Sequence, residues 1–370
     1  MLRDSLDEKV SGARVKVNTG HKLRADKAVR DAEARLRHSD IVGTTTSGRL
    51  GLGCVTRASW KDATLPERRK LVQKEVQSAE EETRQAAAVS MKKQGSWLKW
   101  EGVQARNVSW NDMMKMDHHR IGFLLRSVYD VLPTPTNLRT WILSEDPTCK
   151  LCGRPANLEH ILSSCRAALT DGRYRWRHDK ILSEIAASLD TARKKKLPAH
   201  TRPAFINFVK EGGSVSSNNR STGLLVTARD WELLVDLKRQ LRFPPDVANT
   251  TLRHDILLLS RKTKQIVLLE LTVPWEERME EAHERKNAKY QPLMDECRQR
   301  GWKSWNLPVE VGSRGFAGQS LWRAYSILGI TGMTRRRAIA DVCRQAEAAS
   351  QWLWQKREQR WTAKPVLGQD

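Results

Sequence analysis

The sequence predicts a mixed α+β protein in which an α-rich basic N-terminal region and a small cysteine-rich module precede an α/β domain. Three observations predict this class. Charged, alanine-rich stretches with helix start and stop signals dominate residues 61–194. Three cysteines and a histidine gather between residues 149 and 165. Two short apolar runs follow a stretch rich in glycine, serine and asparagine, and helical patterns flank them.

The balance of charge indicates a polyanionic partner. The chain has 370 residues, with 65 Lys and Arg against 43 Asp and Glu, which gives a formal net charge of +22. A surplus of this size attracts nucleic acid, so we expect DNA as the partner, with RNA as an alternative. No apolar run approaches the roughly 18 to 20 residues of a membrane helix. We expect no membrane partner, no small-molecule substrate and a nuclear location.

Several helices are predicted before the cysteine cluster. Residues 1–60 have the composition of a poorly ordered basic arm with one helix near 24–36. Thr64-Leu-Pro-Glu67 has the form of a capping box and predicts a helix over 65–94. Ser109 and Asp112 begin a second helix that ends before Pro133, and Asn137 is expected to cap a third. A basic helix is expected over 171–193.

The character of the chain changes after a linker at 211–225. We expect a helix over 228–241, two β runs, a helix over 275–300, a strand near 307–311 and further helices from 318. The expected division is an arm at 1–60, a helical basic region at 61–145, a cysteine module with its basic helix at 146–210, the linker at 211–225, an α/β domain at 226–318 and C-terminal helices at 319–370.

A metal-binding pattern lies in the cysteine module, formed by Cys149, Cys152, His160 and Cys165. Zinc prefers four soft or borderline ligands in a tetrahedron, and a Cys-x-x-Cys knuckle supplies two of them from one tight turn. The alternative is a redox pair at Cys149 and Cys152, although no thioredoxin-like strand precedes them. We therefore expect a closed, structural zinc site.

Two acids are predicted to face each other in the α/β domain. A hairpin turn between Lys262 and Thr263 pairs residues whose numbers sum to 525, which places Asp255 opposite Glu270 with Cβ atoms roughly 5 Å apart. Like charges in an apolar sheet are unfavourable, and a divalent cation between them removes the conflict. Magnesium or manganese suits such oxygen ligands. The alternative is a slipped register with both acids in water at the strand ends.

Lys286 is unexpected on the helix after Pro274. It interrupts an apolar stripe that is expected to meet the sheet and that comprises Met279, Ala282, Tyr290, Leu293 and Cys297. One interpretation is a lysine that extends outward to solvent. The other is an ammonium beside the two acids that orients water and offsets negative charge developing at phosphorus.

With these motifs, residues 95–316 resemble the C-terminal part of non-LTR retrotransposon polyproteins, where a Cys-Cys-His-Cys zinc motif precedes a restriction-like endonuclease. The resemblance implies a PD-(D/E)xK nuclease fold. Arg253-His254-Asp255 is similar to its basic-Pro-Asp motif, Glu270 to its second acid, and Lys286 and Tyr290 to its helix-borne lysine and tyrosine. Asp255 and Glu270 would hold magnesium, and Tyr290 would help to place the backbone. The reverse transcriptase domain of the family is missing.

The sequence departs from that family at two positions. His254 replaces the usual proline, and Thr272 stands where ordinary members of the class carry lysine, for which Lys286 is the expected substitute. Pro245-Asp246 offers a competing first acid, but it precedes the strand, so Asp255 is preferred.

The function expected from this reading is metal-dependent hydrolysis of DNA phosphodiester bonds. The residues expected to contact nucleic acid are Arg154, Arg166, Arg173, Arg175, Arg177, Trp176 and Arg253. The alternatives are a non-catalytic zinc-containing nucleic-acid-binding protein with a decayed nuclease fold, and a structural adaptor that uses the helical N-terminal half.

Overall fold

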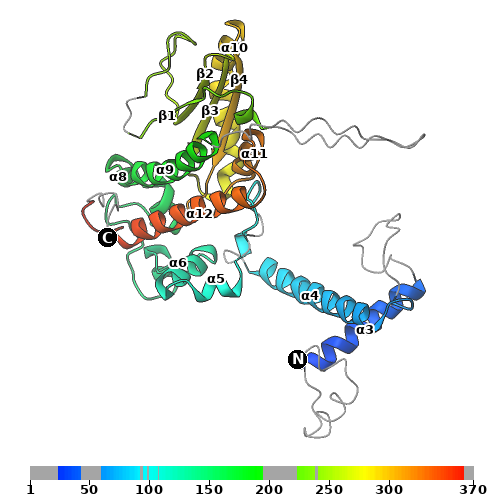
Figure 1. Cartoon of the computed structure of the whole chain (residues 1–370). Coiled ribbons are helices and arrows are strands. Elements are labelled where there is room, and N and C mark those ends of the chain that lie inside the picture. Colours follow the sequence, from blue (N-terminus) through cyan, green and yellow to red (C-terminus); the bar gives the residue numbers. More distant parts are fainter. Residues whose placement is uncertain are drawn as a thin grey trace, which may run out of the picture. The chain divides into compact units, whose positions relative to one another are not determined.

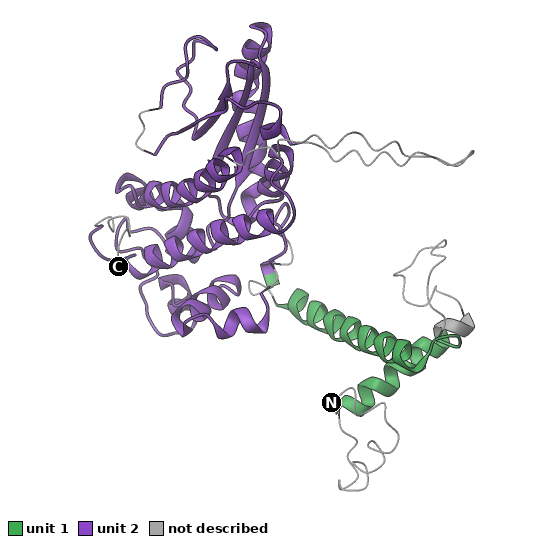
Figure 2. Cartoon of the chain, in the orientation of Figure 1, with its two compact units in different colours: residues 1–95 green, residues 96–370 purple. Residues whose placement is uncertain are grey.

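The computed structural model of the chain (Figure 1) describes residues 24–42, 60–91, 95–97, 100–106, 108–194, 223–237 and 241–361. It divides into two compact units, residues 1–95 and 96–370 (Figure 2), which are described separately. Most of the expected linker at 211–225 and most of the expected basic arm lie outside the described residues. None of the described helices is long and apolar enough to cross a membrane.

Two helices form the described part of the first unit, α3 (Arg24–Val42) and α4 (Leu65–Ser90). The predicted capping box is present, because the carboxylate of Glu67 accepts hydrogen bonds from both the backbone N–H and the hydroxyl of Thr64, at 2.8 and 2.7 Å. Small and apolar side chains of the two helices pack together, including Val29, Ala32 and Val72. The expected helices in this part of the chain are confirmed.

Short helices begin the second unit. They are α5 (Trp110–Met114), α6 (His118–Val128), α7 (Pro135–Thr140), the π-turn η2 (His160–Ser164) and α8 (Arg166–Thr170). The sequence predicted one helix where α5 and α6 stand. The chain breaks between them because Asp117 accepts a hydrogen bond from the backbone N–H of Arg120 and so caps a new helix. Thr134, and not Asn137, caps α7. The expected basic helix is α9 (Arg173–Lys194).

A four-stranded mixed sheet lies at the centre of the second unit, with the order β1-β2-β3-β4. The strands are β1 (Glu232–Val235), β2 (Ile256–Ser260), β3 (Gln265–Thr272) and β4 (Lys303–Glu310). β1, β2 and β3 are antiparallel neighbours, and β4 runs parallel to β3. The crossover between β3 and β4 is a 3-10 turn, η4 (Glu276–Arg278), followed by α10 (Met279–Gln299).

The two faces of the sheet bury different cores. Leu258, Leu269 and Val309 face α9 and two C-terminal helices, α11 (Gln319–Leu328) and α12 (Gly332–Gln355). Leu257 and Leu268 face the opposite way, against Leu293, Met294 and Cys297 of α10. Because side chains alternate along a strand, Glu270 shares the α10 face with Leu268. This parity positions the acidic site described below.

One predicted element is wrong. Residues 228–241 were expected to form a helix, but Glu232–Val235 form the edge strand β1, paired with Ile256–Leu259. The carboxylate of Asp230 accepts hydrogen bonds from the Ser260 hydroxyl and the Lys262 backbone N–H, so it fixes the start of the strand against the hairpin. Leu233 and Val235 pack against the core beneath the sheet. Pairing with β2 therefore outweighs a helical spacing of leucines.

Candidate metal centre and acidic site

The four predicted zinc ligands converge. One donor atom from each of Cys149, Cys152, His160 and Cys165 lies within 4.8 Å of the others. The Cys149 and Cys165 sulfurs are 3.9 Å apart, and Cys152 Sγ lies 3.2 Å from His160 Nε2. A tetrahedral zinc with bonds of about 2.3 Å to sulfur separates two sulfurs by about 3.8 Å. The donor set and its spacing fit a zinc ion.

Local structure explains the convergence. The backbone N–H of Cys149 donates to the Arg154 carbonyl and that of Gly153 donates to the Cys149 carbonyl, at 2.7 and 2.8 Å, which closes the knuckle. Gly153 has φ +70°, a conformation that favours glycine. The π-turn η2 then brings His160 and Cys165, five residues apart, to the same centre.

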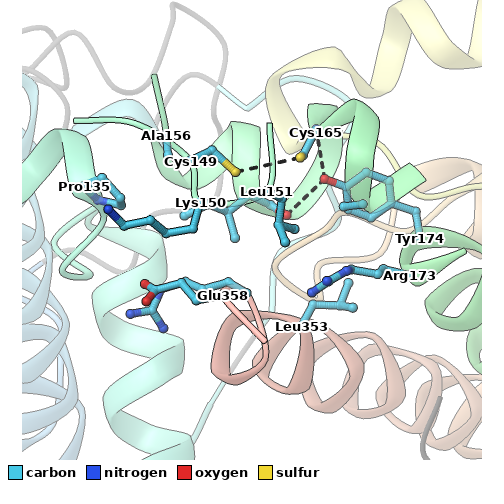
Figure 3. Close-up of a pocket in the computed structure, with 13 residues that line it drawn as sticks. Pro135, Cys149, Lys150, Leu151, Ala156, Cys165, Arg173, Tyr174, Leu353 and Glu358 are labelled. Atoms are coloured by element: carbon cyan, nitrogen blue, oxygen red, sulfur yellow. Dashed lines mark hydrogen bonds and ion pairs between the residues drawn. The ribbon is translucent and has the colours of Figure 1, made fainter. Parts of the chain in front are cut away.

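Burial shifts the pKa values of two of these side chains in opposite directions. It raises the pKa of the Cys165 thiol to about 11, because a thiolate there has lost water, and the neighbouring Cys152 and Cys149 add to the effect, so the thiolate that binds metal is disfavoured until a cation is present. Burial also lowers the pKa of His160, which favours the neutral imidazole that binds metal. Figure 3 shows Cys149 and Cys165 facing each other beside Tyr174, whose hydroxyl accepts from the Cys165 backbone N–H at 3.0 Å and donates to the His160 carbonyl at 3.1 Å.

The residues expected to contact nucleic acid separate into two groups. Arg154, Arg166 and Arg253 are exposed. Arg173 and Arg177 are only 2% and 1% exposed, so the expectation that their guanidinium groups grip phosphates is wrong. Arg173 donates to the carbonyls of Lys356 and Gln359, and Arg177 donates to the Ser350 hydroxyl. These two arginines hold α9 against α12 and the residues that directly follow it.

Two more residues of that expected set are engaged within the protein. Arg175 pairs with Asp179 at 2.9 Å and donates to the Asp236 carbonyl at 3.2 Å. The ring of Trp176 packs edge-on against that of Trp361, with centroids 5.5 Å apart. Both side chains are half-buried. Arg175 and Trp176 therefore contribute to packing within the protein.

The predicted hairpin register is confirmed. Ile256 pairs with Leu269 and Leu257 with Leu268, so each pair of residue numbers sums to 525. Asp255 directly precedes β2, and its carboxylate accepts a hydrogen bond from the Leu271 backbone N–H at 2.9 Å. Asp255 and Glu270 are 8% and 5% exposed. Both acids are therefore buried where β2 begins and β3 ends.

Glu270 carries a free acceptor inside the protein. Its Oε1 accepts a hydrogen bond from Lys286 Nζ at 2.5 Å, so the lysine faces the acid and does not extend outward. Its Oε2 is buried and has no hydrogen-bond partner among the described residues. Burial and the nearby charge of Asp255 raise the pKa of Glu270, and the charge of Lys286 together with the nearby Tyr290 hydroxyl opposes this shift only in part. A cation bound at Oε2 of Glu270 would compensate the buried negative charge of this carboxylate.

Asp255 has a partner that the sequence did not indicate. Its Oδ2 lies 3.2 Å from Nε2 of His178, which belongs to α9. Burial disfavours the charged forms of both groups, but their contact outweighs it. The pKa of Asp255 is therefore lowered, and hydrogen bonds to Asp179 and Asp255 raise the pKa of His178 to about 9. The packing of α9 on the sheet makes this contact, and no local motif indicates it.

Tyr290 and His254 support Asp255 from within the core. Tyr290 is fully buried, and its hydroxyl donates to the Arg253 carbonyl at 2.8 Å, so it holds the segment that leads to Asp255. The His254 ring stacks between Phe243 and Tyr290 at 5.4 and 4.6 Å, and burial lowers its pKa to about 4. The competing acid Asp246 is exposed and pairs with Arg261 at 3.2 Å.

The sequence did not indicate a third acid on the α10 face of the sheet, which also carries Asp255 and Glu270. Glu310 of β4 pairs in register with Thr272 and is 2% exposed. Both of its carboxylate oxygens lie 3.2 Å from Nδ1 of His283, one turn before Lys286 on α10. Strand parity finds this acid once the parallel pairing of β3 and β4 is known, because residues 306, 308 and 310 then face α10.

The chain matches no protein-family model, and no curated protein is significantly similar to it.

Proposed function

We propose that this protein is a metal-dependent DNA endonuclease of the PD-(D/E)xK type. The observation that carries the proposal is the buried Glu270 with one oxygen on Lys286 and the other without a partner, on the same sheet face as Asp255. Such an arrangement is costly for folding alone, since an unsatisfied buried carboxylate oxygen is destabilising. Costly buried ionisable groups with charged neighbours are typical of active sites.

The chain's own residues have distinct roles in this proposal. Asp255 and Glu270 would hold a magnesium or manganese ion, which would supply an activated water and neutralise charge at the phosphate. Lys286 favours the ionised form of Glu270 and offers a cation to the developing charge. Tyr290 fixes the backbone before Asp255 through its hydrogen bond to the Arg253 carbonyl, and His178 of α9 orients the Asp255 carboxylate.

We also propose the wider context that the sequence motifs imply. The sheet with its α10 crossover would be a restriction-like nuclease fold, and the chain would derive from the C-terminal part of a non-LTR retrotransposon polyprotein. DNA, or RNA, would be the partner in the nucleus, and zinc would hold the module at Cys149–Cys165.

The decisive experiment is nicking of supercoiled plasmid in magnesium by the wild type, Glu270→Gln and Lys286→Met. Glu284→Gln is the matched control, because Glu284 is an exposed acid of the same helix. We expect Glu270→Gln and Lys286→Met to lose at least about a hundredfold in rate, and the control to retain full activity. Circular dichroism and thermal unfolding of each variant exclude loss of fold. Equal rates in wild type and Glu270→Gln would reject the nuclease proposal.

The second candidate is a non-catalytic, zinc-containing nucleic-acid-binding protein with a decayed nuclease fold. Lys286 already occupies one oxygen of Glu270. Among the described residues, the zinc cluster is also the only group of three or more His, Cys, Asp or Glu side chains close enough to share an ion. This candidate predicts DNA binding that magnesium does not change and no nicking by any variant.

A further inference from the structure

A wide groove lies in the second unit, away from both sites described above. It has a volume of about 820 Å³, and its walls come from residues 104–120 on one side and from α11 and α12 on the other. Five of the side chains that line it are cationic, namely Arg106, Lys115, Arg120, Arg336 and Arg344, and only Asp112 is acidic. The sequence pattern gave no sign of it, because the two groups of cations, residues 106–120 and residues 336–344, are more than two hundred residues apart.

The inner cations are held by a buried acid. Glu347 of α12 is completely buried, and its carboxylate accepts hydrogen bonds from Arg106 at 2.7 Å and from Arg120 Nε at 2.6 Å. Two guanidinium groups share one carboxylate, so this part of the groove keeps a net positive charge. The arginine heads are fixed in place, and an anion that meets them requires little reorganisation of the protein.

The outer cations form a stripe on the rim. Arg336, Ala340 and Arg344 are spaced by four residues along α12, so they lie on one side of the helix and span about 12 Å. Both arginines are exposed, and the small Ala340 lies between them. Arg344 also forms an ion pair with Asp341 of the same helix, which a bound phosphate would compete with. Lys115 is exposed on the opposite wall. Phosphates bound along the groove would therefore meet cations on both sides.

The floor of the groove is apolar and aromatic. Met116, Ile339 and Trp322 line it, and all three are at least partly buried. The Arg335 guanidinium lies over the Trp322 ring, 3.7 Å from its centroid, so it holds the ring in one orientation and covers one of its faces, and a base would have to meet the rest of the ring. A duplex presents only its phosphates to such a surface, whereas a single strand can also place unpaired bases on the floor. Cations around an aromatic floor are typical of single-strand binding.

We propose that this groove binds a single-stranded segment of nucleic acid, with phosphates along Arg336, Arg344 and Lys115 and a base against Trp322. The proposal goes beyond the proposed cleavage reaction, because it requires neither the acids at 255 and 270 nor a divalent ion. It assigns α12 and the loop before α6 to substrate binding.

The test is fluorescence anisotropy of a labelled single-stranded oligonucleotide in buffer without magnesium and without chelator, so that zinc is retained and cleavage is absent. The groove variant is Arg336→Glu/Arg344→Glu. The matched control is Arg298→Glu/Arg300→Glu, which makes the same charge change at two exposed positions, one in the last turn of α10 and one at its C-cap. Lys115→Glu tests the opposite wall, and thermal unfolding checks the fold of every variant.

We expect the groove double variant to bind at least about tenfold more weakly than the control variant. We also expect its dependence of log K on log salt to flatten by about 1.4, which is two phosphate contacts at 0.7 each. Lys115→Glu should weaken binding in the same direction. An equal loss in groove and control variants, or a loss for duplex DNA with unchanged single-strand binding, would overturn the proposal. Because binding is measured without cleavage, loss of binding in the groove variants stands even if the nicking experiment fails.

Discussion

The buried pair of Arg314 and Glu276 should be the most sensitive point of the second unit. Arg314 is 1% exposed and Glu276 is 0% exposed. The Glu276 carboxylate accepts from the Arg314 backbone N–H and from its Nε, both at 2.7 Å. The guanidinium group lies 3.7 Å from the Trp275 ring centroid and 4.1 Å from that of Trp100. The pair thus ties the turn after β3 to the loop after β4.

Replacement of Arg314 by methionine leaves the Glu276 charge buried with one backbone donor. Breaking a buried pair in this way costs about 3 to 5 kcal/mol, and loss of the two aromatic contacts increases the cost. We therefore expect Arg314→Met to lower the free energy of unfolding by about 4 kcal/mol. Removal of the second charge in Arg314→Met/Glu276→Gln should recover about 2 kcal/mol of this loss.

The assay is urea unfolding followed by circular dichroism and tryptophan fluorescence, with both single variants and the double variant. The single variant Glu276→Gln completes the cycle, because it leaves the arginine unpaired. A loss below about 1 kcal/mol in Arg314→Met, or a double variant no more stable than that single variant, would refute the reasoning. Either result would mean that water reaches the carboxylate.

The other two predictions concern the pH response and the zinc cluster. The His178 pKa is raised in the folded protein from its ordinary 6.5 to about 9. The contribution of His178 to stability is therefore complete below pH 6.5 and is lost as pH rises to 9. Urea unfolding of the wild type should show that the free energy of unfolding falls by at most about 3 kcal/mol over this range. The fall should be smaller in His178→Gln, and parallel curves would contradict the assignment. Cys149→Ser should lose the roughly one equivalent of zinc found by metal analysis of the wild type and should unfold several degrees lower. Wild-type protein that contains no zinc, or equal zinc in both proteins, would remove the metal assignment.

The elements that the sequence predicted are those with local signals. The capping box at Thr64, the cysteine spacing at 149–165 and the hairpin turn before Gln265 each act over a few residues, and the structure contains all three features. The acid at Glu270 and the lysine at 286 also followed from local patterns, strand parity and a helical stripe. Their contact at 2.5 Å agrees with both.

The features that were missed depend on tertiary packing. The leucines of residues 228–241 fit a helix as well as a strand, and only the free edge of β2 decides for β1. Arg173 and Arg177 belong to a basic helix whose composition predicts a solvated surface, yet α12 and the residues after it cover them. His178 and Glu310 reach the acidic site from elements whose neighbours no local pattern specifies.

The first turns of α9 connect the cysteine cluster to the acids. Tyr174 is hydrogen-bonded to the backbone at His160 and Cys165, and His178, one turn later, contacts Asp255. These two positions of the helix are separated by a rise of only about 6 Å, so a displacement of Tyr174 would also displace His178. If the cysteine cluster holds zinc as proposed, removal of the metal by chelators or by oxidation would therefore disturb the alignment of a carboxylate that the metal does not contact. The metal content of each preparation thus has to be known before any activity assay of it is interpreted.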